Sequence, residues 1–331
     1  MSKPKVAFYW CASCGGCEEA VVDLAENILD VVEAVDIVFW PVALDFKKED
    51  VAKMQDKEID VAFINGAIRL GEQEEMVYLL ERKSKMIIAF GSCAHLGGIP
   101  GLGNLWNKES IFNRVYHEVP SLQENNQVVP LEDASMNGHD LHLPEFFDTV
   151  KHLHDLVEVD YYLPGCPPTP KLLLEAIQTI LKGELPPKGT VLSPDKALCD
   201  ECDRNQSKPE KLLIKDLKRV QEVEIDPEKC LLAQGIFCMG PATRSGCGAL
   251  CVNGNMPCTG CFGPTSRVKD QGAKALSGLA SIVDYSDEES IQRLFDKFVD
   301  PVGTFYRYGL PASLLKRKTF HQNSVQESSK G

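Results

Sequence analysis

The chain has 331 residues, 44% of them apolar, which leaves room for about two packed domains of roughly 150 residues each. It carries 48 Asp and Glu against 35 Lys and Arg, a net charge of −13, and this balance argues against nucleic acid or an anionic membrane surface as a partner. No apolar run reaches the roughly 18 residues of a membrane span. The N-terminal residues contain neither a long apolar core nor a twin-arginine pair, so we expect a cytoplasmic protein that is not exported.

Thirteen cysteines are the strongest signal in the composition. Structural disulfides explain them poorly in a cytosolic chain, whereas thiolate ligation of metal explains them well. Thirteen cysteines suffice for three four-cysteine sites with one cysteine left over. The sequence therefore predicts several metal centres held by sulfur.

The first cysteines come directly after a strand-like run at residues 5–10. In an open α/β sheet, ligands bind at the carboxyl ends of the strands, and the N-terminus of the next helix favours the negative charge of thiolate-bound metal. The Gly pair between Cys14 and Cys17 favours these two as ligands, and Cys11 is an alternative to either of them. One amphipathic helix is expected to follow, with its apolar face running from Val21 to Val32.

Glu18 and Glu19 stand at the start of that helix. The simpler interpretation is that these acids complement the positive end of the helix dipole. The alternative is a polar contact with a partner subunit.

Strand-like and helix-like segments alternate along the first half of the chain, which is typical of an α/β fold with a doubly wound parallel sheet. Thr169 and Pro170 suit the N-cap and first position of the last helix of this half, and Gly183 suits its end. Strands are expected at 5–10, 35–40, 59–64, 86–90 and 159–163, and helices at 72–84, 145–156 and 171–182.

Cys93 and Cys166 also come directly after strands, each beside Gly or Pro. Because the carboxyl ends of parallel strands share one edge of a sheet, these two thiols can converge with Cys14 and Cys17. The alternative, that Cys93 and Cys166 are ordinary buried residues, fits their neighbours less well, since those are not apolar.

A Pro- and Gly-rich segment at 184–196 reads as a linker, and a second cysteine region follows it. Cys199, Cys202, Cys230 and Cys238 can form a four-thiol site closed by a long loop. A structural zinc is the alternative for these four. The further cluster that begins nine positions after Cys238 favours iron–sulfur chemistry.

The last cluster reads C-x3-C-x6-C-x2-C and is interrupted by Gly and Pro. A packing role would use Leu, Val or Ile instead. Small residues let the backbone fold around an inorganic core and aim N–H groups at its sulfurs, so this pattern indicates an iron–sulfur site. Its cysteines are Cys247, Cys251, Cys258 and Cys261.

The expected organisation is a first domain at 1–183, the linker at 184–196, a two-cluster domain at 197–314 and a polar tail at 315–331. Helices are expected at 272–283 and, behind a capping box of Ser286 and Glu289, up to Val299. No acid–base set, nucleophile or nucleotide loop stands out, so no catalytic residue is assigned.

Five motifs, in order, resemble those of the small subunit of [NiFe] hydrogenases, and the resemblance covers nearly the whole chain. It implies a flavodoxin-like first domain that holds a proximal [4Fe–4S] cluster through Cys14, Cys17, Cys93 and Cys166. This cluster would lie next to a nickel–iron centre on a partner large subunit. The motifs are Cys14-Gly15-Gly16-Cys17-Glu18, Gly91-Ser92-Cys93-Ala94, Pro164-Gly165-Cys166-Pro167-Pro168, Cys238-x-Gly240-Pro241-x-Thr243 with Cys247, and Pro257-Cys258-Thr259-Gly260-Cys261.

Two departures from the common family pattern change the expected clusters. The usual distal cluster has a His ligand where this chain has Cys199, which implies an all-cysteine distal site with Cys202, Cys230 and Cys238. The usual medial cluster is a three-iron type with three cysteines, whereas here Cys251 supplies a fourth ligand beside Cys247, Cys258 and Cys261. The resemblance therefore suggests three [4Fe–4S] clusters and a lower medial potential.

The all-cysteine set looks like that of the cytoplasmic hydrogenases of methanogens, and most like the F420-non-reducing (methyl-viologen-reducing) type that feeds heterodisulfide reductase. The implied function is electron transfer from H2 oxidation on the large subunit, through three clusters, to an iron–sulfur or flavin acceptor subunit. The F420-reducing type is the near alternative. A ferredoxin-like carrier, the related quinone-reductase subunit of respiratory complexes and a zinc-binding structural protein are further alternatives.

Overall fold

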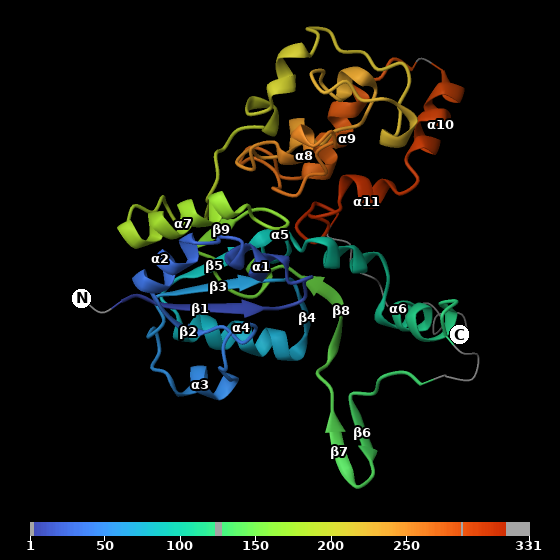
Figure 1. Cartoon of the computed structure of the whole chain (residues 1–331). Helices are drawn as coiled ribbons and strands as arrows, with labels where there is room; N and C mark the ends of the chain where they lie inside the picture. The colour runs from blue at the N-terminus through green and yellow to red at the C-terminus, as the bar shows by residue number, and fades with distance from the viewer. Residues whose placement is uncertain (1–2, 123–127, 286, 316–331) are drawn as a thin grey trace.

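A computed structural model describes residues 3–122, 128–285 and 287–315 of the chain (Figure 1). A six-stranded, fully parallel sheet forms the centre of the N-terminal part, with the strand order β10-β9-β5-β3-β1-β2. Apart from the added edge strand β10, this is the flavodoxin-like order, so the predicted α/β fold class is confirmed. The strands are β1 (Lys5–Trp10), β2 (Asp36–Phe39), β3 (Val61–Asn65), β5 (Ile87–Phe90), β9 (Tyr161–Leu163) and β10 (Thr190–Val191).

Helices cover both faces of the sheet, and each face has its own hydrophobic core. Because side chains alternate along a strand, Phe8 of β1 packs on the face covered by α1, α2 and α7, while Ala7 packs on the face covered by α4. Figure 1 shows α2 and α7 on one side of the sheet and α3 and α4 on the other. The helices are α1 (Gly16–Val22), α2 (Asn27–Ala34), α3 (Lys48–Lys53), α4 (Gly71–Lys83), α5 (Gly91–Leu96) and α7 (Pro170–Lys182).

The predicted caps of α7 are confirmed. The Thr169 hydroxyl accepts the backbone N–H of Leu172 at 3.3 Å, and Pro170 is the first helical residue. Gly183 ends the helix with a left-handed φ of 69°, a conformation that favours glycine.

The single helix expected along the face from Val21 to Val32 is wrong, because the chain breaks into α1 and α2. Ala25 has a positive φ of 52° in the connecting turn. Val21 and Leu24 are buried against the sheet, but Leu29 is 66% exposed. The apolar periodicity therefore continued past the point at which packing on the sheet required a turn.

The helix expected at 145–156 is also wrong. This segment contains strand β8 (Phe146–Lys151), antiparallel to β4 (Ile68–Leu70), and a short 3-10 turn at Leu153–Asp155. The buried amide of Asn104 donates to the Val150 carbonyl at 2.9 Å and accepts the Val150 N–H at 2.7 Å. These partners, which are distant in the sequence, hold the segment extended, and the sequence of the segment itself does not indicate them.

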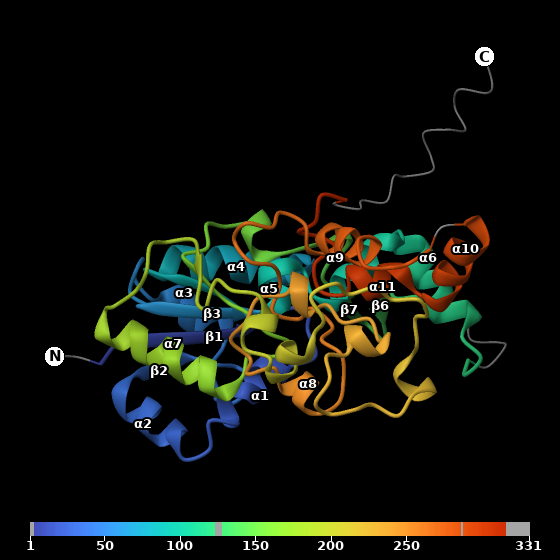
Figure 2. The same cartoon turned by 90° about the horizontal axis from the view of Figure 1, so that it is seen from above.

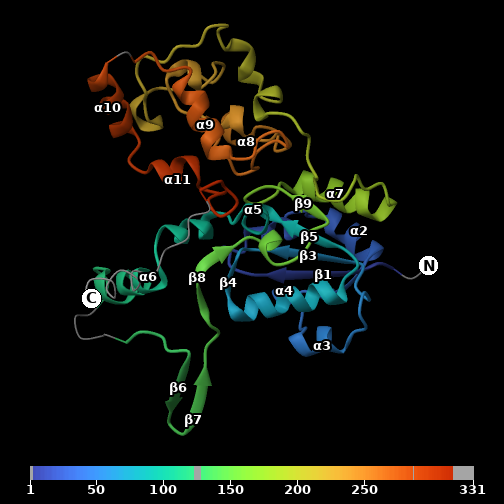
Figure 3. The same cartoon turned by 180° about the vertical axis from the view of Figure 1, so that it is seen from behind.

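A hairpin of β6 (Asp133–Met136) and β7 (His139–His142) projects from the body (Figure 3). It lies on the side of the sheet away from the C-terminal part. The segment before it contains the 3-10 helix Ile99–Leu105, α6 (Lys108–Asn113) and a π-helical turn at Arg114–Glu118.

The C-terminal part is a separate hydrophobic core wrapped mostly by short helices. Figures 1 and 2 show it lying over α5, while most of α7 extends away from it. The expected helix at 272–283 is confirmed as α9, whereas the Ser286 cap lies outside the described residues. The helices are α8 (Leu250–Asn253), α9 (Gln271–Ala280), α10 (Glu288–Lys297) and α11 (Pro301–Phe305), with 3-10 turns at Leu198–Asp200, Asp203–Ser207, Val220–Glu222, Leu232–Gln234 and Gly240–Ala242.

The two parts are joined through their cores. Phe262, in the C-terminal part, is 2% exposed and packs in the N-terminal core with Phe8 and Phe63. The Gly98 N–H also donates to the Tyr308 carbonyl at 2.9 Å. Within the described ranges, no helix is both long and apolar enough to cross a bilayer.

Candidate metal centres

The first four candidate ligands meet at one edge of the parallel sheet. Burial raises the pKa of the Cys17 thiol. Three other thiols lie close enough to raise it further, those of Cys93, Cys166 and Cys14. Each follows a strand of the sheet: β1 precedes Cys14 and Cys17, β5 precedes Cys93, and β9 precedes Cys166. The fold thus brings together thiols that are far apart in the sequence.

Two glycines leave space for sulfur atoms at this edge. Gly91 has a φ of +84°, and a Cβ there would lie 2.3 Å from the Cys17 sulfur. Gly98 has a φ of +59°, and a Cβ there would lie 2.3 Å from the Cys93 sulfur. The backbone N–H of Ile99 also donates toward the Cys93 sulfur. Both turns are therefore shaped around a thiol, and only glycine fits them.

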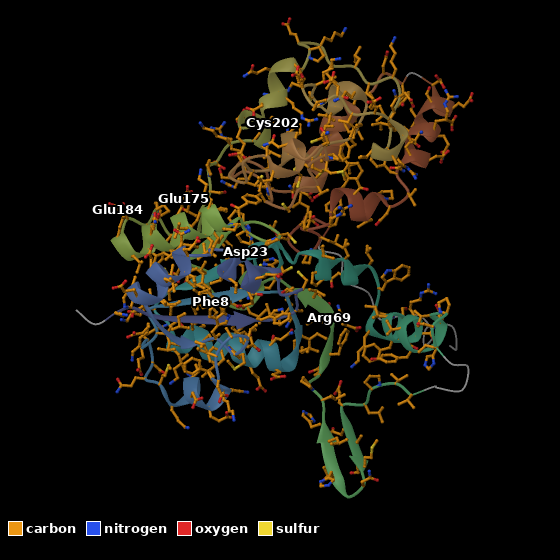
Figure 4. The ribbon with its side chains drawn as sticks, in the orientation of Figure 1. Phe8, Asp23, Arg69, Glu175, Glu184 and Cys202 are labelled. Atoms are coloured by element: carbon orange, nitrogen blue, oxygen red, sulfur yellow. The ribbon has the colours of Figure 1, made fainter. Side chains whose placement is uncertain are left out.

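The second four candidate ligands line one small cavity of about 20 Å³ in the C-terminal part, where Figure 4 labels Cys202. A Cβ at Gly240 would lie 3.4 Å from the Cys199 sulfur and 3.5 Å from the Cys238 sulfur. Burial raises the pKa of Cys199 to about 12 and that of Cys238 to about 11. The four thiols are those of Cys199, Cys202, Cys230 and Cys238.

The last four candidate ligands also lie together. Burial raises the pKa of Cys261 to about 12, and the thiols of Cys247 and Cys251 are near enough to raise it further. Burial also raises the pKa of Cys247, and the Cys251 thiol adds to that shift. The Cys258 pKa is well above its ordinary value, mainly through burial, and the nearby thiols of Cys238 and Cys261 raise it further. Cys251 is exposed, but it belongs to this group.

Hydrogen-bond donors point at the sulfurs of this last group. The N–H of Ala249 donates toward Cys247. The N–H of Gly260 donates toward Cys258. Donors of this kind stabilise a negatively charged sulfur and are one of the means by which proteins set cluster potentials.

The third group lies between the first and the second. The backbone N–H of Cys166 donates toward the Cys261 sulfur, and the Ser92 hydroxyl donates to the Cys261 carbonyl. On the other side, the N–H of Cys258 donates to the Cys238 sulfur at 3.3 Å. A ligand of each outer group therefore touches a ligand of the middle one.

The donor sets suit iron–sulfur clusters. All candidate ligands are thiols, and backbone N–H groups face several of them, as cluster sites require. In a four-iron cluster each thiolate binds a different iron, so the sulfurs surround the cluster. In the part of the chain that is described, no three His, Cys, Asp or Glu side chains converge closely enough to hold a single ion. Burial raises the pKa of the Cys17, Cys199 and Cys261 thiols, so metal binding must displace a proton from each of them.

Cys11 lies apart from these groups. It is 5% exposed and packs in the core on the α4 face, with Ile64 among its neighbours in that core. Its N–H donates to the Asn65 carbonyl at 2.8 Å, and burial alone raises the pKa of its thiol. It is not among the thiols of the three groups and packs in this core.

Glu18 is a polar residue that sequence reasoning placed incorrectly. It is 4% exposed, and its carboxylate accepts hydrogen bonds from Trp40 Nε1 and Asn65 Nδ2. Burial raises its pKa, and these two donors oppose that shift. It is neither a solvent-facing helix acid nor free for a partner, whereas Glu19 is exposed. The sequence feature that could have indicated its burial was its position next to Cys17, on the buried side of α1.

Glu201 is a second residue that sequence reasoning missed. Its carboxylate accepts the N–H groups of Gly246 at 3.0 Å and Gly248 at 3.1 Å, and it lies 3.8 Å from the Cys247 sulfur. It thereby joins the loop of Cys199 and Cys202 to the loop of the last group. The sequence feature that could have indicated this contact was the position of Glu201 between Cys199 and Cys202.

Comparisons with known proteins bear on the whole chain. The family described as "NADH ubiquinone oxidoreductase, 20 Kd subunit" matches residues 14–180. The chain is 41% identical to the iron-sulfur subunit of the F420-non-reducing hydrogenase of Archaeoglobus profundus, over 96% of this chain and 99% of that protein. It is 39% identical to a subunit of the F420-non-reducing hydrogenase of Methanothermobacter thermautotrophicus, over 96% of this chain and 97% of the relative.

A solved structure supports the fold. The [NiFeSe] hydrogenase of Desulfovibrio vulgaris Hildenborough aligns with a TM-score of 0.51 and 16% identity, over 80% of this chain and 94% of that chain. The match to the two F420-non-reducing hydrogenase relatives continues through the second cysteine region, whereas the quinone-oxidoreductase match ends before it.

Proposed function

This chain belongs to the [NiFe]-hydrogenase small-subunit family that includes the iron-sulfur subunits of the F420-non-reducing hydrogenases, and from that premise we propose that it holds three [4Fe–4S] clusters and conducts electrons between them. It is thus one subunit of an oxidoreductase and works with a large subunit. The grouping of twelve cysteines into three sets of four, in contact with one another, carries the proposal.

Each set of cysteines would bind one cluster. The clusters supply one-electron redox centres when bound, and this chain positions them, shields them from water and directs N–H groups at their sulfur ligands. Cys14, Cys17, Cys93 and Cys166 would hold the proximal cluster. Cys247, Cys251, Cys258 and Cys261 would hold the medial cluster, and Cys199, Cys202, Cys230 and Cys238 the distal one.

The contacts between groups support this order. Cys166 touches Cys261, and Cys258 touches Cys238, and these two contacts support the series proximal, medial, distal. No residue of this chain is assigned to the chemistry of H2, which we place on the large subunit. A division into domains at 1–183 and 197–314 accompanies this proposal, supported by the separate core of the C-terminal part.

The large subunit would cover the sheet edge around the proximal group. Cys14 is exposed there, Trp10 packs beside Gly15 and is 39% exposed, and Ile99, whose N–H faces Cys93, is 51% exposed. Apolar side chains next to a buried redox site suit a partner that must exclude water.

The electron acceptor would be an iron–sulfur or flavin subunit linked to heterodisulfide reductase, in the cytoplasm. The names of the relatives, which describe F420-non-reducing hydrogenases, favour this type over the F420-reducing alternative. An acceptor would dock nearest the distal group, which lies at the end of the series.

The test uses the anaerobically purified complex of this chain with its large subunit. In the variant Cys238→Ala, H2 should still reduce the proximal and medial clusters, as seen by EPR, while transfer to the acceptor subunit falls to background. Cys11→Ala is the matched control and should keep the full rate. Transfer at the wild-type rate in Cys238→Ala would contradict the proposed path, and a wild-type complex that takes up no H2 would contradict the function itself.

A further inference from the structure

A large pocket in the C-terminal part lies next to the distal cysteine group, with Cys238 in its wall. Its volume is about 540 Å³, and its floor is apolar, built by Phe237, Leu279 and Ile282 among others. Leu213 lines it and is 44% exposed. A cavity of this size with an apolar floor is large enough to receive side chains of another molecule.

Three lysines stand around this floor: Lys208, Lys211 and Lys274. All three are exposed, and none forms an ion pair with a carboxylate of the described residues. Glu210 is the single acid of the lining. Residues 208–219 carry five Lys and Arg and two Asp and Glu, although the whole chain has a net charge of −13. The pocket is thus a local basic site on an acidic protein.

The pocket shares a wall with the distal cysteine group. Cys238, Leu232 and Pro241 line both the pocket and the cavity that the four distal thiols enclose. Lys208 is also close enough to Cys199 to lower the pKa of its thiol, against the larger effect of burial. A molecule bound in the pocket would therefore lie one side chain away from the distal site.

We propose that this pocket receives an acidic segment, carrying an apolar anchor side chain, of the subunit that takes electrons from the distal cysteine site. The proposal rests on the proposed electron-transfer function. Carboxylates of the segment would face Lys208, Lys211 and Lys274, and its anchor would enter the apolar floor beside Leu213. Complementary charge speeds association, and a buried apolar anchor supplies most of the affinity of such contacts.

The charge of the pocket argues against an occupant from this chain. The C-terminal residues 316–331 carry four Lys and Arg and one Glu, so their charge has the same sign as the three lysines. An acidic partner segment is the occupant that complements both the apolar floor and the rim formed by Lys208, Lys211 and Lys274. Its place against Cys238 also puts the acceptor where transfer is shortest.

The first test reverses the charge of the rim in the purified complex that contains the large subunit and the co-purifying acceptor subunit. In the triple variant K208E/K211E/K274E, affinity for the acceptor subunit should fall at least about tenfold, and the loss should shrink as salt rises. The matched control K47E/K182E/K269E changes three exposed lysines outside the pocket by the same charge and should bind as the wild type does. Binding of the triple variant within about twofold of the wild type would overturn the proposal.

The second test probes the floor. Leu213→Asp should weaken acceptor binding, whereas Leu276→Asp, which changes a 41% exposed leucine that does not line the pocket, should not. A photo-crosslinking amino acid at position 213 should join to a Glu- or Asp-rich peptide of the acceptor subunit. Crosslinks to the large subunit or to a second copy of this chain, or loss of a bound small molecule without loss of acceptor binding, would overturn the proposal.

A third measurement separates this inference from the proposed function. H2-dependent reduction of a small viologen dye does not need the acceptor subunit, so K211E/K274E and Leu213→Asp, which leave Lys208 beside Cys199 unchanged, should keep the wild-type dye rate. If dye reduction is absent in the wild type, the electron-transfer function fails. If dye reduction is intact but the variants bind the acceptor subunit normally, or the wild type binds no such subunit, only the docking proposal fails.

Discussion

Replacing Glu201 by Gln should raise the potential of the medial cluster. The carboxylate lies 3.8 Å from the Cys247 sulfur and accepts the N–H groups of Gly246 and Gly248. Gln keeps an oxygen that can accept both bonds but removes the negative charge. Reduction adds a negative charge to the cluster, so loss of a nearby negative charge makes reduction easier.

The size of the shift follows from the distance. A unit charge about 6 to 7 Å from the cluster centre interacts with roughly 2 to 3 kcal/mol at an effective dielectric of about 20. Glu201 is half-buried, so water screens part of this, and about 1 to 2 kcal/mol remains. For one electron, a tenfold change in equilibrium is about 59 mV, so the expected shift is roughly +40 to +90 mV.

An EPR-monitored redox titration of the purified complex measures the shift. Glu224→Gln is the matched control, because it removes the same charge from an exposed side chain that makes no described hydrogen bond or ion pair. The iron content of both variants should equal that of the wild type. A medial potential that falls, or that moves no further than in Glu224→Gln, would refute the electrostatic reasoning.

Three further variants test the sites and the joint between the two parts. Gly91→Ala should lower the iron content and the thermal midpoint more than the control Gly189→Ala does. Both glycines have φ near +85°, but only at Gly91 would a Cβ strike the Cys17 sulfur. Equal iron content and equal thermal midpoints in the two variants would argue against a turn shaped around that sulfur. Cys251→Ser should convert the medial EPR signal to that of an oxidised three-iron cluster, and an unchanged spectrum would remove Cys251 from the ligand set. Phe262→Ala should lower the free energy of unfolding by about 3 to 5 kcal/mol, because it removes a buried aromatic side chain, and limited proteolysis should then separate the two parts. A proteolysis pattern equal to that of the wild type would mean that other contacts hold the parts together.

Much of the fold was predictable because its signals are local. Short β-rich runs alternate with helical segments, and the caps at Thr169 and Gly183 act within a few residues of themselves. The parallel order then follows from the rule that places the ends of successive strands on one edge. Three cysteine-bearing loops follow such strand ends, which is why the first group could be predicted to converge.

The errors share a different cause. Residues 146–151 are extended because β4 and Asn104 pair with them, and both partners lie more than 40 positions away. Glu18 and Glu201 were misjudged or missed because acids are usually solvated. Their partners, Trp40 and Asn65 for one and the Gly246 turn for the other, are neighbours only in the folded chain.

The most direct test of the three-cluster account is the iron and acid-labile sulfide content of this chain in anaerobically purified complex, with EPR after stepwise reduction. The account predicts about twelve iron and twelve sulfide per chain, beyond the iron of the large subunit, and only [4Fe–4S] signals. About eleven iron with a three-iron signal would show that Cys251 is not a ligand of the medial cluster. About four iron with zinc in the C-terminal part would contradict the account of that part as an electron path.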